Sequence, residues 1–285
     1  MQKKICWRIT RRCNLSCIFC LASENQYLDR ELNTRQVLLI LDFLKNCGIN
    51  KVTFSGGEPL LREDFRTILS ACYRKGIDTT ITTNGILLNE AWHETLSHGN
   101  IVTKVSIHGT KSIHDSQVRA NIYDLVLDNL KSLSRSGSKV AVNCVLSRLN
   151  SESIKVFLEE ISDVALDHIL FQYLIYRGRA KNLHSIDLLK DEKEKLEDDL
   201  FYWIEKIGYK FNIKFNDYAK ENIPYLILES DGTLVIANDY TSKDIKVGPC
   251  SEKNLIKAIN SVYNLDNFSV FQSQYNHMNG DLFHQ

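Results

Sequence analysis

The alternation of strand-like and helical segments constrains the fold of this chain more than any other feature. Six apolar runs have the length and composition of strands: Ile5–Thr10, Val52–Phe54, Ile77–Thr82, Val102–Ile107, Val140–Leu146 and Ile169–Ile175. Segments with a helical period separate these runs: Asn33–Cys47, Asp64–Lys75, Asn89–Leu96, Tyr123–Ser136 and Ser151–Ile161. Strands joined by helical crossovers lie parallel, and the helices cover the sheet. The order of segments therefore predicts an α/β domain built on a parallel sheet.

Local signals within the helices support this assignment. Asn33 and Ser151 precede two of them, and such side chains accept hydrogen bonds from the free backbone amides of a first turn. In the helix Tyr123–Ser136 we expect the apolar side chains to face the sheet: Leu125, Val126, Leu130 and Leu133. These signals indicate helices that begin at defined residues and cover one face of a sheet.

Three cysteines lie close together after the first predicted strand. Cys13, Cys17 and Cys20 have the spacing C-x3-C-x2-C, and the next cysteine is Cys47. Three thiolates so close in sequence can bind three irons of a [4Fe–4S] cluster and leave the fourth iron open for a cofactor. A zinc site is the alternative, but zinc sites usually pair C-x2-C with a second pair of cysteines or histidines, which this sequence lacks. The spacing therefore predicts an iron–sulfur cluster.

A second motif follows the second predicted strand. Val52–Phe54 leads into Ser55-Gly56-Gly57-Glu58-Pro59, and a helical pattern resumes near Glu63. Glycines allow the backbone to approach a ligand closely, and Glu58 can accept hydrogen bonds from an ammonium group. The motif predicts a ligand-binding turn at the C-terminal end of this strand.

With these two motifs in this order, residues 5–180 resemble the radical S-adenosylmethionine (SAM) superfamily. The resemblance implies a partial (β/α)6 barrel over residues 1–180, with the cysteines holding the cluster. The open iron would bind the amino and carboxylate groups of SAM, and the Gly-Gly-Glu-Pro turn would contact the amino group. An electron from a reductant such as flavodoxin or ferredoxin would cleave SAM to methionine and a 5′-deoxyadenosyl radical, which abstracts hydrogen from the substrate.

Polar residues at the C-terminal ends of later strands are candidates for the rest of the SAM site, because sites in such sheets lie there. By the resemblance, Ser106 and Asn143 would hold the ribose or methionine part of SAM, and Asn84 could serve the same end. Arg119, expected after a loop, could pair with the SAM carboxylate. Each has an alternative as a turn, capping or surface residue. His108 could face the substrate or be a hydrogen-bonded structural residue.

The composition changes after residue 180. We expect residues 181–285 to form a C-terminal α+β extension that covers the barrel mouth, with a helix near Asp187–Ile207, a hairpin over Tyr225–Ala237 and a helix over residues 251–261. The hairpin and the following Gly248-Pro249-Cys250 resemble the start of the cysteine-rich SPASM or twitch extension found in peptide-modifying members. The resemblance therefore implies a degenerate form of that extension.

Cysteine content separates this extension from its relatives. Residues 145–285 contain one cysteine, Cys250, so we expect a single cluster and a redox-neutral reaction. Radical SAM epimerases return hydrogen to the substrate from a cysteine thiol, and by that resemblance Cys250 is the candidate catalytic residue. The alternative for Cys250 is a small buried apolar residue.

Three functions follow from these observations. The first is an enzyme that abstracts hydrogen from a peptide residue or a small polar metabolite such as a sugar or aminocyclitol. The second is a viperin-like nucleotide dehydratase, although Val142 and Ile169 or Leu170 stand where viperin carries the lysines that hold a triphosphate. The third is a non-catalytic Fe–S binding module that has kept the fold.

Bulk composition narrows the possible partners. The 285 residues include 35 Lys and Arg and 35 Asp and Glu, so no basic excess favours nucleic acid. The sequence contains no uncharged apolar run of about twenty residues, so we expect no membrane span. Residues 1–8 lack the apolar core of a signal peptide. Together with the metal-like spacing of three cysteines, these features lead us to expect a reducing, cytoplasmic location.

Overall fold

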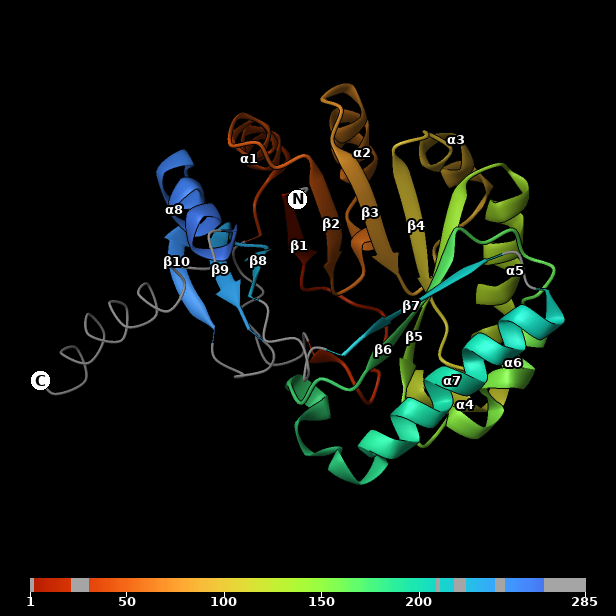
Figure 1. Cartoon of the computed structure of the whole chain (residues 1–285). Coiled ribbons are helices and arrows are strands. Elements are labelled where there is room, and N and C mark those ends of the chain that lie inside the picture. The colour runs from red at the N-terminus through yellow and green to blue at the C-terminus, as the bar shows by residue number, and fades with distance from the viewer. Residues whose placement is uncertain (1–2, 22–30, 209–210, 218–223, 239–243, 264–285) are drawn as a thin grey trace, which may run out of the picture.

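The computed structural model describes residues 3–21, 31–208, 211–217, 224–238 and 244–263. Within these ranges ten strands form one sheet, in the order β10-β9-β8-β1-β2-β3-β4-β5-β6-β7. Strands β1 to β6 each pair in parallel with the strand that follows them in the chain. Figure 1 shows this sheet curving, with helices arranged around its outside.

All six predicted strands are present. Their bounds are β1 Lys4–Thr10, β2 Lys51–Gly56, β3 Asp78–Thr83, β4 Ile101–Ser106, β5 Lys139–Leu146 and β6 His168–Tyr173. Helices connect each strand to the next, as parallel pairing requires. The predicted α/β class with a partial (β/α)6 barrel is confirmed.

The helices agree with the sequence pattern except in two places. Their bounds are α1 Thr34–Asn46, α2 Phe65–Arg74, α3 His93–Leu96, α4 Lys111–Val118, α5 Tyr123–Arg135, α6 Ile154–Glu160, α7 Lys190–Ile207 and α8 Glu252–Tyr263. Asn33 caps α1 as predicted, through a reciprocal pair of bonds with Gln36. Ser151 does not cap a helix, because it begins a 3-10 turn ahead of α6. Helix α4 was not predicted, because its eight residues are mostly polar.

The two faces of the curved sheet differ in polarity. Along β4 the residues Ile101, Thr103 and Val105 are buried, whereas the alternate residues are only partly buried. This alternation follows from the period of two in a strand, which sends successive side chains to opposite faces. The buried set packs under the helices: Trp7 and Phe54, for example, lie 5.7 Å apart between ring centroids. We call the opposite, more polar side the inner face.

The C-terminal strands continue the same sheet at both of its edges. β7, Asn212–Asn216, pairs in parallel with β6, and β8, Tyr225–Leu228, pairs in parallel with β1. The predicted hairpin is formed by β8 and β9, Thr233–Ala237, and β10, Ile245–Pro249, follows it. β7 and β10 were not predicted, because their short sequences mix polar and apolar residues. The domain division at residue 180 stays a prediction.

The helices of the described segments are those of a globular domain. The longest, α7, carries charged residues along most of its length. Among the described residues, no helix combines the length and the apolar composition that crossing a bilayer requires.

Leu130 and Leu125 lie on opposite sides of α5 and offer a matched test of its packing. Leu130 is 0% exposed, whereas Leu125, which the sequence placed toward the sheet, is 47% exposed. We expect Leu130→Ala to lower the free energy of unfolding by about 2–5 kcal/mol, because it leaves a cavity, and Leu125→Ala by less than about 1 kcal/mol. Urea unfolding measures both changes. Equal losses would contradict the orientation of α5.

Candidate active site

The segment that carries the three predicted cluster cysteines follows β1 and is held by a distant residue. Cys13 is exposed, and Cys17 and Cys20 are partly buried. Arg179, which lies after β6, binds this segment twice. Its Nε donates to the Cys17 carbonyl at 2.8 Å, and its backbone amide donates to the Cys20 carbonyl at 3.0 Å. The cysteine segment, residues 11–20, is therefore held in place by a residue that follows β6.

The Gly-Gly turn at the end of β2 packs directly on the start of this segment. The Gly57 amide donates to the Thr10 carbonyl at 2.8 Å, and the Glu58 amide donates to the Arg12 carbonyl at 2.7 Å. A Cβ atom on Gly56 would lie 2.1 Å from the Thr10 oxygen, and one on Gly57 would lie 2.0 Å from the Arg12 oxygen. These separations leave no room for a side chain. The sequence predicted close approach to a ligand, whereas the observed close approach is to the chain's own backbone.

Glu58 binds within the protein. Its side chain is buried, and its carboxylate accepts hydrogen bonds from the Leu60 amide at 3.0 Å, the Thr83 hydroxyl at 2.8 Å and the Asn84 amide at 2.7 Å. Burial raises the pKa of Glu58 above its usual 4.5, while these three donors favour the charged form. These bonds join the ends of β2 and β3 through the carboxylate, and its contact with an ammonium group stays a prediction.

Asn84 connects the end of β3 to the cysteine segment. Its Nδ2 donates to Oδ1 of Asn14 at 2.7 Å, and its Oδ1 accepts from the Ile86 amide at 3.1 Å. Asn14 is the neighbour of Cys13 in the chain. The structure thus places Asn84 beside the predicted cluster site, and its contact with SAM stays a prediction.

Ser106, Asn143 and Ser55 lie on the inner face near the C-terminal ends of three strands. Ser106 and Asn143 are direct partners in the pairing of β4 with β5. Ser55 Oγ lies 3.3 Å from Sγ of Cys6. The structure therefore brings Ser106 and Asn143 together as a polar pair, and it places the Cys6 thiol on the inner face.

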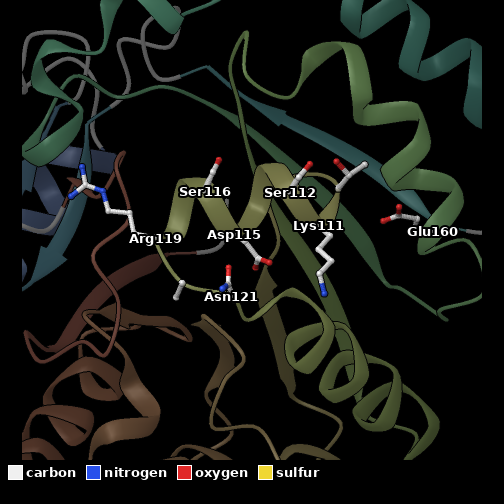
Figure 2. A pocket seen from close by; sticks show the side chains of 9 residues that line it. Lys111, Ser112, Asp115, Ser116, Arg119, Asn121 and Glu160 are labelled. Atoms are coloured by element: carbon white, nitrogen blue, oxygen red, sulfur yellow. The ribbon is translucent and has the colours of Figure 1, made fainter.

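Arg119 ends helix α4 in a left-handed backbone conformation, with a φ of 59°. Such a conformation costs about 1–2 kcal/mol for a residue with a side chain, so the surrounding structure must enforce it. Two residues earlier, the Gln117 carbonyl accepts a hydrogen bond from the Ile18 amide at 2.9 Å. Figure 2 shows the Arg119 side chain at the end of α4, directed away from Lys111. The end of α4 thus adjoins the cysteine segment, and the pairing of Arg119 with SAM stays a prediction.

A cleft of about 690 Å³ lies along α4 (Figure 2) and shares only Arg119 with the predicted site. Its lining residues are Thr110, Lys111, Ser112, Asp115, Ser116, Arg119, Ala120, Asn121 and Glu160. None of the three cysteines, the Gly-Gly turn or the inner-face residues lines it. We therefore do not assign this cleft to the active site.

His108 has a structural role. Its Nδ1 accepts a hydrogen bond from the Val145 amide at 3.1 Å, and its ring packs edge-on against Phe19 with 4.5 Å between centroids. Burial lowers the pKa of His108 well below 6.5, so the imidazole is neutral at pH 7. These contacts favour the structural alternative that the sequence left open.

Cys250 lies on the helix side of the sheet. Its side chain packs against the core formed between the sheet and the helices, and its amide donates to the Gly232 carbonyl at 2.8 Å. Burial, and after it the neighbouring Cys47 thiol, raises the pKa of Cys250 to about 12. This position does not support the predicted role of Cys250 as a hydrogen donor, because a substrate in the barrel would face the opposite side of the sheet.

The three thiols of the cysteine segment fit an iron–sulfur cluster. Burial raises the pKa of Cys17 to about 12, and the next largest causes are the Cys20 and Cys13 thiols, so the three groups act on one another. A cubane cluster takes one thiolate per iron, and binding to iron displaces the thiol proton.

Comparison with known families decides the identity of this arrangement. The model of the Radical SAM superfamily matches residues 7–161. The chain belongs to the radical SAM superfamily. Its members use a [4Fe–4S] cluster and SAM, and these are the cofactors of this radical SAM enzyme.

The relatives differ in activity. An Fe-coproporphyrin III synthase from Methanosarcina barkeri is 28% identical over 209 residues, which are 72% of this chain and 52% of the relative. A probable GTP 3′,8-cyclase from Saccharolobus islandicus is 29% identical over 239 residues, which are 82% of this chain and 73% of the relative. The chain spans about half the length of the first relative, so that protein's activity cannot be transferred to it directly.

A solved structure has the same fold. It is Streptococcus suis SuiB bound to the precursor peptide SuiA, with a TM-score of 0.75 and 18% identity, covering 87% of this chain and 62% of SuiB. At this identity the likeness establishes the architecture alone.

Sequence reasoning missed the residues that hold the cysteine segment in place. Arg179 and Gln117 bind it from distant parts of the chain, and neither belongs to a recognisable motif. One signal was available for Arg179, because it follows the sixth predicted strand, at the end of the sheet where sites are built. The contact of Gln117 could be found only from the folded chain.

Gly57→Ala tests the contact between the two motifs, and Gly99→Ala is its control, because a Cβ atom on Gly99 would meet nothing within 4 Å. We expect Gly57→Ala to lower the free energy of unfolding by about 1–3 kcal/mol, because the new methyl group displaces the Arg12 carbonyl. The displaced cysteine segment should also retain less iron after reconstitution. Urea unfolding and iron analysis measure both effects. A Gly57→Ala protein that matches Gly99→Ala in both would contradict the contact.

Proposed function

We propose that this chain cleaves SAM reductively at a single [4Fe–4S] cluster and abstracts hydrogen from a peptide residue or a small polar metabolite such as a sugar or aminocyclitol. The observation that carries the proposal is the direct backbone contact between the cysteine segment and the Gly-Gly turn, at the C-terminal ends of β1 and β2. When bound, the cluster and SAM supply the electron and the radical. The protein orients and shields the reacting groups.

The residues of the two motifs have distinct roles in this proposal. Cys13, Cys17 and Cys20 would each bind one iron, because they present three thiols from one short segment. Ser55–Pro59 would contact the amino end of SAM through backbone groups. The Glu58 carboxylate is already bound by three donors, so it positions the turn.

Polar groups at other strand ends would orient the rest of SAM. Ser106 and Asn143 offer a hydroxyl and an amide side by side, which suits the ribose or methionine part. Asn84 lies next to the cysteine segment and would add an amide contact. Arg119 would pair with the carboxylate, and its enforced backbone conformation supports a functional role.

The reaction that follows SAM cleavage is proposed from cysteine content and relatives. Residues 145–285 contain only Cys250, so no second cysteine-bound cluster is available there to accept an electron, which favours a redox-neutral reaction. SuiB, whose fold this chain shares, was solved with a precursor peptide. We therefore favour a peptide among the substrate classes, with flavodoxin or ferredoxin as reductant.

A viperin-like nucleotide dehydratase is a second candidate, and one observation removes the objection that the sequence raised against it. The sequence argued against a triphosphate because Val142 and Ile169 are apolar, but both belong to the helix-side core. Their character therefore says nothing about the inner face, where only Leu170 of the three lies. Inhibition of SAM cleavage by nucleoside triphosphates would distinguish this candidate, and any SAM cleavage would exclude a non-catalytic binding module.

Epimerisation with Cys250 as hydrogen donor is the weakest of the proposed reactions, because Cys250 packs on the helix side. Its test is direct. A Cys250→Ala enzyme that still gives an unchanged product would exclude the donor role.

The cluster assignment predicts which cysteines hold iron. We expect Cys13→Ala, Cys17→Ala and Cys20→Ala each to abolish 5′-deoxyadenosine formation and to lower iron well below about four per chain, because each removes one of three ligands. Cys250→Ala should retain about four irons and cleave SAM. Anaerobic reconstitution, iron and sulfide analysis, and incubation with SAM and dithionite provide the readouts. About eight irons in the wild type, or full activity in any of the three variants, would contradict the assignment.

A further inference from the structure

Lysines on two strands project into the barrel. Lys104 on β4 lies between Thr103 and Val105, which are fully buried under the helices, so its own side chain points to the inner face. On β7, Lys214 adjoins Phe215, which packs on the helix-side core, and it therefore also points inward. The inward position of Lys214 could not be predicted from the sequence, because β7 was not predicted.

Register and electrostatics place the two ammonium groups within reach of one another. Across the sheet, Lys104 on β4 is aligned with Ala141 on β5, and Ala141 is aligned with His168 on β6. Lys214 on β7 is aligned with Leu170, which is the next residue after His168 on β6 to face inward. Burial lowers the pKa of His168, and Lys214 and Lys104 lower it further, whereas the Asp167 carboxylate raises it. The curved sheet thus directs both lysines toward one region of the inner face.

The positive charge of this region is not neutralised within the described residues. Neither lysine forms an ion pair with a carboxylate there, and the groups that act on Lys104 are the Cys6 thiol and three lysines: Lys4, Lys214 and Lys51. Burial is the largest cause that lowers the pKa of Lys104, to about 8. Asp167 does not reach the lysines, because its carboxylate pairs with Nδ1 of His168 at 2.7 Å. Lys104 is partly buried, whereas Lys214 is exposed. A partly buried ammonium group without a counter-charge is unfavourable, and an anion bound beside Lys104 would relieve that cost.

We propose that Lys104 and Lys214 bind an anionic group of the substrate, a phosphate or a carboxylate, on the inner face of the barrel. The proposal rests on the function proposed above, because it assigns part of the substrate to the same face as Ser106 and Asn143. Lys214 is aligned through Leu170 with that pair, and Lys104 precedes Ser106 by two residues along β4. An anion there lies below the cysteine segment, so the rest of the substrate extends toward the strand ends where SAM would bind.

Titration calorimetry with two inorganic or simple organic probes tests the site in the reconstituted full-length protein with SAM present. Inorganic triphosphate represents a phosphate group, and tricarballylate represents a carboxylate. We expect at least one probe to bind the wild type, and Lys104→Met and Lys214→Met each to weaken that binding at least tenfold. Lys190→Met is the matched control, because the Lys190 side chain is 76% exposed on α7, and it should change the affinity less than twofold.

The pattern of binding identifies the group and can overturn the proposal. Binding of triphosphate alone assigns a phosphate, and binding of tricarballylate alone assigns a carboxylate. Binding of neither probe, or equal binding by the wild type and both inner-face variants, would overturn the proposal. Lys104→Met should not lower stability in urea unfolding, because it replaces an unpaired charge with a side chain of similar length. Lost binding with intact stability therefore reports on the site and not on misfolding.

The same preparations separate this inference from the proposed function. 5′-Deoxyadenosine formation with dithionite reports on SAM cleavage, and Lys190→Met should leave it unchanged. A protein that binds the anion but never cleaves SAM would overturn the proposed function and leave the anion site standing. A protein that cleaves SAM but binds neither probe would overturn the anion site and leave the proposed function standing.

Discussion

The structure depends on one close contact between backbones. The Gly-Gly turn after β2 lies against Thr10 and Arg12 at separations that no side chain permits, and two amide-to-carbonyl hydrogen bonds hold it there. This contact fixes the start of the cysteine segment against the turn. Because the same turn continues into Glu58, it also connects the start of the cysteine segment to the end of β3 through Thr83 and Asn84. The two sequence motifs therefore act as one structural unit.

Distant residues complete the enclosure of the cysteine segment. Arg179 binds it from beyond β6, 162 positions away from Cys17, and Gln117 binds it from α4. Such contacts need no particular side chain at the accepting end, because they use backbone carbonyl groups. They fix the path of the segment without engaging the sulfur atoms, which suits residues that must bind a metal cluster. Three separate parts of the chain thus contribute to the position of one short loop.

The second constraint is the alternation of side chains along each strand. Apolar residues gather under the helices and supply the hydrophobic stabilisation, which leaves the inner face available for polar groups. The pair Ser106 and Asn143, the thiol of Cys6 and the inner lysines all occupy that face. The alternation also explains why Val142 carries no information about the site, and Cys250, which follows β10, packs on the same helix side. Both lie on the helix side of the sheet, so their chemistry concerns packing.

The sequence by itself determined the six-unit α/β core, the cap at Asn33 and the location of both cofactor motifs, because period, capping residues and short spacings are local properties. It did not determine the environment of Glu58, the side on which Cys250 packs, or the strand β7 with Lys214. Those features depend on which distant strands become neighbours and on which face each residue presents. A shift of one residue along a strand would move a side chain from the helix-side core to the inner face, and only the tertiary structure decides which face it occupies.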